Sequence, residues 1–409
     1  MLDAVVIGAG HAGLAVSQRL AAAGLDHVVL ERGAVGESWR AQRWDSFHLN
    51  TPNRMNALPG TPYAGDAPDA FEHRDDWVAR LERYVREHAL PVRTGTAVRQ
   101  VRADDGGFRV VSDDAERRAR TVIVAAGVLH APKLPPAAAT LDPAIARLTT
   151  GTYRGPAQLP PGAVLVVGSA QSGVQIAEDL LAAGRTVYLA TGKVGRAPRR
   201  LRGRDTLVWM TENGWLDQRP ADLPDPAMVR WAQPQISGVG PAGHTVSYRS
   251  LRERGVTLLG RVEAFDGTRA RFAADLPAHV AFADEIARRL AEFVDEHIAR
   301  RGIAAPPSDP DPANVPADPG TFSAPAELDL RDRGIAAVIF STGFGADLSW
   351  LQVPALDADG TPRHTEGVTG VPGLWFVGLP WMRTRKSGII WGAREDSEHI
   401  VAQVRAHLG

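Results

Sequence analysis

The chain has 409 residues, enough for two domains of ordinary size, and its hydrophobic share of 44% is that of a globular protein. A net charge of −1 argues against a nucleic-acid or acidic-membrane partner. The chain contains no cysteine, which excludes disulfides, thiolate nucleophiles, iron–sulfur clusters and redox-active cysteine pairs.

The chain opens on an apolar strand that leads into GAGHAG, residues 8–13. This start leaves no room for a signal peptide, and no apolar run reaches the roughly 20 residues of a membrane helix, so we expect a cytoplasmic protein without a membrane segment. A strand, a G-x-G-x-x-G turn and a helix together are typical of a dinucleotide-binding βαβ unit. In such a unit Gly8 allows the tight turn, Gly10 lets the backbone approach a pyrophosphate, and Gly13 lets helix and strand pack closely.

Glu31 closes the second strand of this unit, which reads HVVLE. An acidic side chain at that position accepts hydrogen bonds from ribose hydroxyls and repels a 2′-phosphate. The first unit therefore predicts FAD or NAD as its ligand and not NADP. The alternative interpretation, a glycine-rich turn followed by a surface glutamate, requires the strand, the spacing and the acid to coincide by chance.

The next elements are an amphipathic helix and a group of strands. The helix is predicted over DDWVARLERYVREHA, with Asp75 or Asp76 as its cap. Alternating strands follow over residues 96–113, with a turn at the paired glycines, and TVIVAAG reads as a buried strand.

A second glycine turn lies in mid-chain. A shift of about 160 residues places Gly8 and Gly13 on Gly168 and Gly173, within VLVVGSAQSG. Ala170 replaces the middle glycine, but the strand before it and the helix after it are in the same places. The repeat predicts a second βαβ unit, and its turn adds two candidate cofactor contacts, Gln171 and Ser172.

The charge after this second unit is opposite to that of the first. The position that matches Glu31 is Thr191, and a basic run follows it: Lys193, Arg196, Arg199, Arg200, Arg202 and Arg204. Cations near the end of this strand are what a 2′-phosphate requires, so we expect NADPH here, contacted by Lys193, Arg199 and Arg200. The alternative is a solvated basic loop. FAD in the first unit and NADPH in the second would let hydride pass from nicotinamide to flavin.

The last third of the chain completes the domain prediction. A proline-rich excursion is expected over residues 302–325, followed by the strands AAVIFSTGF and GLWFVG and a closing helix. The predicted fold class is α/β, with two Rossmann-like dinucleotide-binding domains and the NADPH domain inserted in the FAD domain. The FAD domain would comprise residues 1–157 and 346–409, and the NADPH domain residues 158–345.

These motifs resemble a known family. GAGHAG, GSAQSG, GESWR, VIVAAG and FSTGF together resemble flavin-containing monooxygenases of the two-dinucleotide-binding-domain type. Bacterial FAD-dependent oxidoreductases labelled as potassium-transport flavoproteins and plant YUCCA-type enzymes are similar to the chain over nearly its whole length, and least over residues 205–325.

The resemblance implies an active site around two segments. GESWR implies that Trp39 and Arg40 lie near the flavin and its phosphates, and FHLNTPNRM implies that Asn50 is an active-site residue with Thr51 beside it. His48 is a further catalytic candidate. The alternatives are that Trp39 is a core aromatic and that Asn50 only bonds loop backbone.

The resemblance also implies contacts from other segments. These further flavin contacts are Arg32, Val98, Ala125, Ala126, Gly127, Gly378, Gly388 and Ile389, and the nicotinamide contacts are Thr342 and Gly343. At Gly388 and Ile389 a helix N-terminus would face the pyrimidine edge of the flavin and stabilise its reduced, anionic form.

Two departures from the family refine the functional prediction. Thr149 stands where the inter-domain monooxygenase fingerprint has histidine, which argues most against Baeyer–Villiger chemistry. Leu379 follows Gly378, where disulfide reductases have aspartate, and this argues against a reductase of that type.

The predicted function is an FAD-dependent, NADPH-using monooxygenase. It would act through a flavin C4a-hydroperoxide on a small nucleophilic organic substrate, with O2 as co-substrate and no metal. Two alternatives stay open: an NADPH-dependent reductase or oxidase that passes electrons to a quinone, O2 or a protein, and a non-catalytic redox sensor. A homodimer would be ordinary for such a protein.

Overall fold

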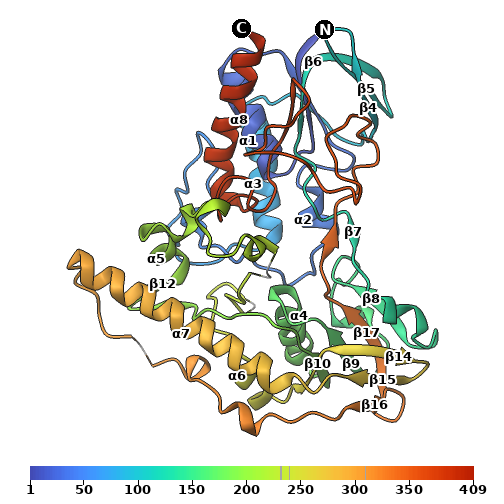
Figure 1. Ribbon diagram of the computed structural model, residues 1–409, viewed down its shortest axis with the longest axis vertical. Helices are drawn as coiled ribbons and strands as arrows, with labels where there is room; N and C mark the ends of the chain where they lie inside the picture. Colours follow the sequence, from blue (N-terminus) through green and yellow to red (C-terminus); the bar gives the residue numbers. More distant parts are fainter. Residues whose placement is uncertain (231–232, 239, 309) are drawn as a thin grey trace.

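The computed structural model describes residues 1–230, 233–238, 240–308 and 310–409. The chain forms two α/β units arranged along the long axis of the molecule, and both termini lie at the same end (Figure 1). The unit at that end contains the first glycine turn, and the other unit contains the second.

Seven strands form the sheet of the first unit, in the order β3-β2-β1-β6-β5-β4, with β19 also paired to β6. Strands β1, β2, β3, β6 and β19 run parallel, whereas β4, β5 and β6 form an antiparallel meander. The strands are β1 (Leu2–Ile7), β2 (His27–Leu30), β3 (Val92–Arg93), β4 (Val98–Asp104), β5 (Gly107–Ser112), β6 (Glu116–Val124) and β19 (Leu374–Phe376).

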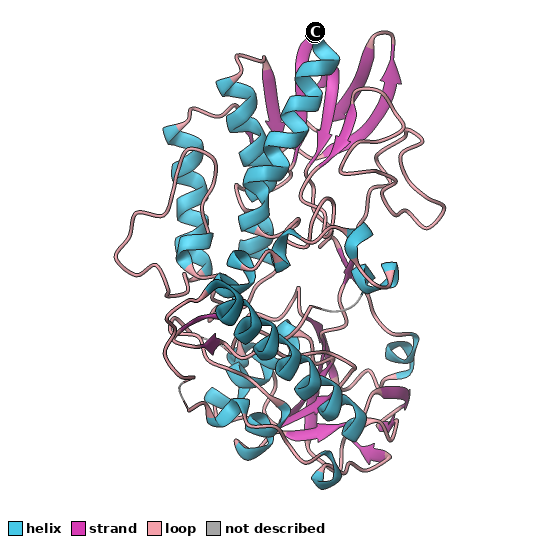
Figure 2. Ribbon diagram, turned by 60° about the vertical axis from the view of Figure 1, so that its left-hand side comes forward, coloured by secondary structure: helices cyan, strands magenta, loops and turns pink. Residues whose placement is uncertain are grey.

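Helices cover one face of this sheet. They are α1 (His11–Ala22), α3 (Arg74–Glu87) and α8 (Ala393–Leu408), and Figure 2 shows them side by side next to the strands. Because β1 is covered on both faces, it reads as the continuous apolar run AVVI and is fully buried there. Helix α8 returns the C-terminus to the first unit, where Arg19 Nε of α1 donates to Ser397 Oγ at 3.0 Å.

The cap of α3 differs from the prediction. The helix begins at Arg74, before both predicted caps, and the imidazole of His73 accepts a hydrogen bond from the Asp75 N–H at 3.2 Å. His73 satisfies a free N–H of the first turn, as Ser or Asp does in most helices.

A second sheet of five parallel strands builds the other unit, in the order β13-β10-β9-β17-β8. Helix α4 (Gln171–Ala182) connects β9 to β10, as the second glycine turn predicts. A small antiparallel sheet lies beside it. The strands of the two sheets are β8 (Ala146–Thr149), β9 (Ala163–Val167), β10 (Val187–Ala190), β13 (Thr257–Leu259), β14 (Val262–Asp266), β15 (Arg269–Phe272), β16 (Glu327–Asp329) and β17 (Ile335–Phe340).

Two short strands connect the units. The chain leaves the first unit through β7 (Ala131–Pro132) and returns through β18 (Phe344–Gly345), and these two strands pair antiparallel. The predicted fold class is confirmed: an α/β chain with two parallel dinucleotide-type sheets, the second inserted in the first.

The remaining elements lie mostly in the second unit. Helix α7 (Leu276–Arg301) is the longest of the described helices, and the described residues of the range 302–325 after it contain only short 3-10 turns as regular structure. None of the described helices combines the length and apolarity needed to cross a membrane. The other short elements are α2 (Glu37–Ala41), β11 (Arg200–Leu201), β12 (Arg204–Asp205), α5 (Thr206–Glu212) and α6 (Tyr248–Glu253).

The register of each sheet brings loop residues together at one edge. In the first sheet Ile7 lies between Leu30 and Val124, so the strands end level at their carboxyl edge. In the second sheet Val167 lies between Ala190 and Phe340 in the same way. The crevice beyond the carboxyl ends of parallel strands is where such sheets bind ligands.

Candidate functional site

The first glycine turn is tightly packed at two positions and open at a third. Gly8 has φ +109°, and a Cβ there would lie 2.6 Å from the Ala125 carbonyl oxygen. A Cβ on Gly13 would lie 2.0 Å from the Gly8 carbonyl oxygen, so helix and strand approach as closely as backbone allows. A Cβ on Gly10 would meet nothing within 4 Å. The backbone at Gly10 therefore faces open space at the N-terminus of α1, where N–H groups are free for an anion.

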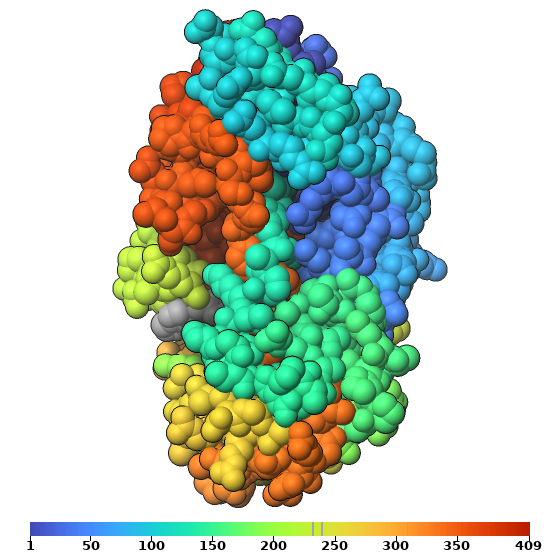
Figure 3. Space-filling view, turned by 90° about the vertical axis from the view of Figure 1, so that its right-hand side faces the viewer, coloured from blue at the N-terminus to red at the C-terminus, as the bar shows by residue number. Residues whose placement is uncertain are grey.

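That open space is part of a cavity of about 620 Å³ at the carboxyl edge of the first sheet. Segments from the N-terminal third of the chain and from the C-terminal region contribute to its wall, and Figure 3 looks onto the face where these segments meet. Its size is within the range of cofactor pockets. The predicted residues on its wall are Gly8, Gly10, Glu31, Arg32, Trp39, Val98, Ala125, Ala126, Gly127, Gly378 and Gly388.

Glu31 is fixed at one end of this cavity by backbone hydrogen bonds. Its Oε2 accepts from the Ala9 N–H at 2.8 Å, and its Oε1 accepts from the Gly33 N–H at 2.9 Å. Charge-assisted bonds of this kind hold a carboxylate in one orientation. The carboxylate is therefore preorganised at the place where a ribose would lie.

Several residues predicted near the flavin are not on this wall. Arg40 points away and pairs with Glu82 of α3 at 2.5 Å, because it lies on the exposed side of the short helix α2. Gly13 is beneath the turn, and the Ile389 N–H is bonded to the Lys386 carbonyl oxygen at 3.2 Å.

The segment with the two catalytic candidates lies next to the second unit. His48 is half-buried, with Nδ1 3.0 Å from the Ser46 carbonyl oxygen and its ring 5.2 Å from that of His73. Burial is the main cause that lowers the pKa of His48. The Thr51 hydroxyl donates to the Asn56 side chain. Neither His48 nor Thr51 is among the residues that line the cavity.

Asn50 is bound by two residues of the second unit. Its Oδ1 accepts from Gln175 Nε2 of α4 at 3.0 Å, and its carbonyl oxygen accepts from Arg199 Nη1 at 3.0 Å. Both partners are buried. The side chain and the backbone of Asn50 are therefore positioned by the second glycine-turn unit.

The wall also contains two residues that sequence reasoning missed, His11 and Arg43. Burial lowers the pKa of His11 to about 4, so its imidazole is neutral at pH 7. The Arg43 guanidinium lies 5.4 Å from the centres of both the Trp39 and the Phe47 rings. The only sequence signal for Arg43 is its place three residues after Arg40, just beyond the GESWR motif.

The second glycine turn repeats the geometry of the first. Gly168 has φ +102°, and a Cβ there would lie 2.4 Å from the Ser341 carbonyl oxygen. A Cβ on Gly173 would lie 1.9 Å from the Gly168 carbonyl oxygen. Gln171 at the start of α4 accepts from the Ile236 N–H at 2.7 Å, and Ser172 follows it in the first turn of the helix.

The chain after β17 lies against this turn and leads back to the first unit. Thr342 and Gly343 follow Ser341 directly, and the Gly343 carbonyl oxygen accepts from the Lys133 N–H at 2.8 Å. The structure thus brings the predicted residues of the second turn and the returning strand to one edge of the second sheet.

The basic run after β10 divides into exposed and buried cations. Lys193 and Arg200 are exposed, and Lys193 Nζ lies 4.9 Å above the Phe282 ring. Arg199 is buried and forms an ion pair with the equally buried Asp205. Burial lowers the pKa of Arg199, although Asp205 opposes the shift. The expectation that Arg199 contacts a 2′-phosphate is not supported by its position, because its guanidinium is engaged by Asp205 and Asn50 inside the protein.

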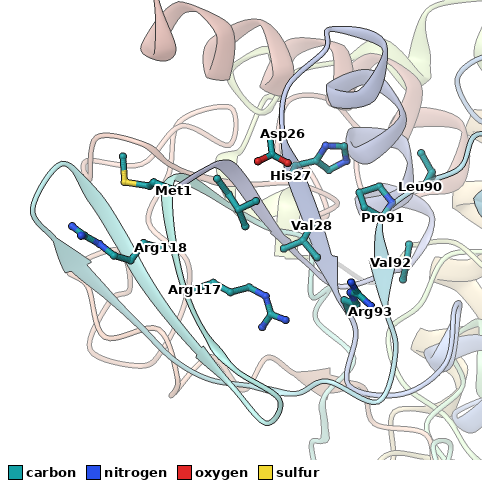
Figure 4. A pocket seen from close by; sticks show the side chains of 11 residues that line it. Met1, Asp26, His27, Val28, Leu90, Pro91, Val92, Arg93, Arg117 and Arg118 are labelled. Carbon is teal, nitrogen blue, oxygen red and sulfur yellow. The ribbon is translucent and has the colours of Figure 1, made fainter.

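A further cavity, of about 680 Å³, lies at the opposite edge of the first sheet. Figure 4 shows its walls, which come from the amino ends of β1 and β2 and from β3 and β6. None of the predicted site residues lines it. Since parallel sheets bind ligands at their carboxyl edge, this cavity is not the candidate site. No group of His, Asp or Glu side chains in the described part of the chain is arranged to hold a metal ion.

Comparisons with known proteins agree with this geometry. Residues 5–202 match the family described as pyridine nucleotide-disulphide oxidoreductase. The chain is 29% identical to an uncharacterized CzcO-like oxidoreductase of Geobacillus kaustophilus (strain HTA426), over all of this chain and 99% of that protein. It is 30% identical to indole-3-pyruvate monooxygenase YUCCA1 of Oryza sativa subsp. japonica, over 59% of this chain and 60% of that protein.

A solved structure is similar along the whole chain. The flavin-containing monooxygenase from Stenotrophomonas maltophilia superimposes with a TM-score of 0.69 at 22% identity, over 100% of this chain and 99% of that one. The chain is therefore similar to CzcO-like oxidoreductases and YUCCA monooxygenases in sequence, and to a flavin-containing monooxygenase in fold.

Proposed function

We propose that this oxidoreductase is an FAD-dependent, NADPH-using monooxygenase. The observation that carries the proposal is the opposite charge after two equivalent strands: buried Glu31 directly follows β2 of the first unit, and exposed Lys193 lies three residues after β10 of the second. A carboxylate favours a ribose with free hydroxyls, and a cation favours a 2′-phosphate. FAD therefore belongs to the first unit and NADPH to the second.

The first unit has the shape and the donors that FAD needs. Backbone N–H groups at the start of α1 receive the diphosphate, and Glu31 receives the adenine ribose. Trp39, Val98 and Ala125 to Gly127 form the wall along which the rest of the molecule extends, and Gly378 and Gly388 close it from the C-terminal segment.

In the second unit, Gly168 and Gly173 let the turn, the returning strand and α4 pack closely, and the dinucleotide diphosphate would lie at the start of α4. Lys193 and Arg200 are the exposed cations of the basic run and would contact the 2′-phosphate. Thr342 and Gly343 lie on the segment that returns to the first unit, where the nicotinamide must reach the flavin.

Bound FAD would supply the oxidative chemistry, through a C4a-hydroperoxide formed with O2, and a small nucleophilic organic substrate would accept the oxygen. The contribution of the chain is to position groups and to exclude water. Asn50 is the proposed hydrogen-bond donor of the active site, because Gln175 occupies its Oδ1 and leaves the Nδ2 amide to face a ligand. The absence of cysteine from the sequence argues against thiol-dependent disulfide reduction.

Stopped-flow absorbance tests this proposal in two mixing steps. NADPH is first mixed with the yellow protein without oxygen, and we expect the flavin to be reduced faster by NADPH than by NADH. Oxygenated buffer is then added, and we expect an oxygen-adduct band before the oxidised spectrum returns. Fast reoxidation without that band would favour a reductase or oxidase, and no reduction at all would favour a redox sensor.

A further inference from the structure

Arg43 is a cation on the cavity wall whose side chain is held by aromatic faces. Its guanidinium lies 5.4 Å from the centres of the Trp39 and Phe47 rings, and its Nη1 donates to the neighbouring Gln42 carbonyl oxygen at 3.0 Å. The backbone is fixed as well, since the Arg43 carbonyl oxygen accepts from the Arg74 guanidinium. The position of this charge is therefore set before any ligand binds.

In the described part of the chain, no carboxylate lies within 4.0 Å of Arg43. Its neighbours differ in this respect: Arg40 is paired with Glu82 at 2.5 Å, and Arg74 is paired with Asp45 at 2.7 Å. Burial alone lowers the pKa of Arg43 to about 10, so the guanidinium is charged at pH 7 and has lost solvation. A half-buried cation without a counter-charge loses part of its solvation, and an anionic ligand would compensate for that loss.

The wall indicates where that anion would lie. The His11 ring at the start of α1 is 6.4 Å from the Trp39 ring, and Trp39 in turn contacts Arg43, so the guanidinium and the helix N-terminus are neighbours along one wall. His11 is neutral at pH 7 and supplies no charge. Arg99, also on the wall, is already paired with Asp113 at 2.6 Å.

Arg32, the other cation on the wall, directly follows Glu31 and is exposed. It therefore stands at the ribose end of the cavity, next to a carboxylate that is itself bound by backbone N–H groups. Arg43 is the one that stands beside Trp39 and the start of α1.

We propose that Arg43 binds the diphosphate of the flavin cofactor, opposite the N-terminus of α1, and that Arg40 does not. This inference rests on the proposed function, because it takes FAD as the ligand of the first unit. A guanidinium donates two parallel hydrogen bonds to phosphate oxygens, and the stacked rings hold its plane for that contact.

The test compares two arginines that lie three residues apart, and it measures binding and not turnover. Flavin is removed from the full-length protein, and FAD is titrated back while its fluorescence is followed. The variants are Arg43→Met, Arg43→Lys and, as the matched control, Arg40→Met. Riboflavin, which has no phosphate, is titrated in parallel as a second probe.

We expect Arg43→Met to raise the Kd for FAD about 10- to 100-fold and to change the Kd for riboflavin less than about twofold. Arg43→Lys keeps the charge, and its loss of FAD affinity is expected to be less than about a third of the loss in Arg43→Met. Arg40→Met should bind FAD as the wild type does. Raising the NaCl concentration should weaken FAD binding by the wild type more than by Arg43→Met, a difference that a purely structural role would not produce.

Three results would overturn the inference. An unchanged FAD affinity in Arg43→Met, or an equal loss for FAD and riboflavin, would show that Arg43 does not contact the diphosphate. An equal loss of FAD affinity in Arg40→Met would also argue against a specific contact between Arg43 and the diphosphate. If the wild-type protein binds no FAD, the proposed function fails together with the inference. The first three outcomes overturn the inference but leave the proposed function intact.

Discussion

Arg199 and Asp205 form an ion pair in which the two side chains are 1% and 0% exposed. Removing one partner of such a pair leaves the other charge buried without compensation, which costs about 3–5 kcal/mol. Arg199→Met is therefore expected to lower the free energy of unfolding by about that amount in urea denaturation. The ratio of the KM values for NADPH and NADH should stay within about twofold of the wild type, because the guanidinium is engaged inside the protein.

Lys193 should behave in the opposite way, because it is exposed and lies three residues after the end of β10. Losing a charge-assisted contact to a 2′-phosphate costs about 1.5–3 kcal/mol, or roughly 10- to 150-fold. Lys193→Met is expected to raise the KM for NADPH within that range and to leave NADH turnover and the unfolding midpoint unchanged. An equal rise for both nucleotides would contradict a role of Lys193 at the 2′-phosphate.

Local spacing explains which site residues could be predicted from sequence. The glycines of both turns and Glu31 are placed by the geometry of a single βαβ unit, so the spacing in the chain is enough to find them. Arg40, Arg43 and Arg199 could not be distinguished in this way. Which cation faces a cavity and which meets a carboxylate depends on Glu82 and Asp205, and neither contact follows from the spacing of the motif.

At the scale of the element, the junction between β1 and α1 depends on the close approach of two backbones. A Cβ on Gly13 would lie 2.0 Å from the Gly8 carbonyl oxygen, whereas a Cβ on Gly10 would meet nothing within 4 Å. Gly10 also has ordinary extended backbone angles, φ −81° and ψ −178°. The two glycines of one turn therefore have separate roles, packing for Gly13 and ligand approach for Gly10.

Alanine at these two positions should separate the roles. Gly13→Ala is expected to destabilise the protein by about 1–3 kcal/mol, seen as a lower Tm of the flavin-free form in circular dichroism. Gly10→Ala should keep that Tm, but its methyl group would enter the cavity and weaken FAD binding. A normal Tm in Gly13→Ala would show that α1 can shift away from β1 without cost.

Elements with strong local patterns could be predicted from the sequence, whereas elements that depend on tertiary packing were harder to predict. The parallel strands are continuous apolar runs because both faces are covered, which makes β1 and β9 easy to recognise. The predicted cap of α3 was wrong, because an imidazole that caps a helix has no strong sequence signature. Helix α7 lies within the stretch that resembles the family least, and its length of 26 residues was not anticipated.

At the scale of the whole molecule, helix α4 joins the two units through two side chains of the first, Ser46 and Asn50. Asp179 of α4 accepts hydrogen bonds from Ser46 Oγ at 2.5 Å and from Tyr153 Oη at 2.6 Å. One turn earlier on the same helix, Gln175 holds the side chain of Asn50. The helix that begins at the second glycine turn therefore also fixes the orientation of the proposed active-site amide.

This arrangement predicts that loosening α4 from Asn50 uncouples electron supply from its use. In Gln175→Leu the Asn50 amide loses the donor that orients it, a contact worth about 0.5–1.5 kcal/mol. We expect NADPH oxidation without substrate, followed as H2O2 release, to rise about 2- to 12-fold, while the KM for NADPH changes less than twofold. Gln100→Leu is the matched control, because Gln100 bonds Gln352 at the exposed edge of the first sheet. If both variants release H2O2 at the wild-type rate, the position of Asn50 does not depend on α4, and the contacts of α4 only hold the two units together.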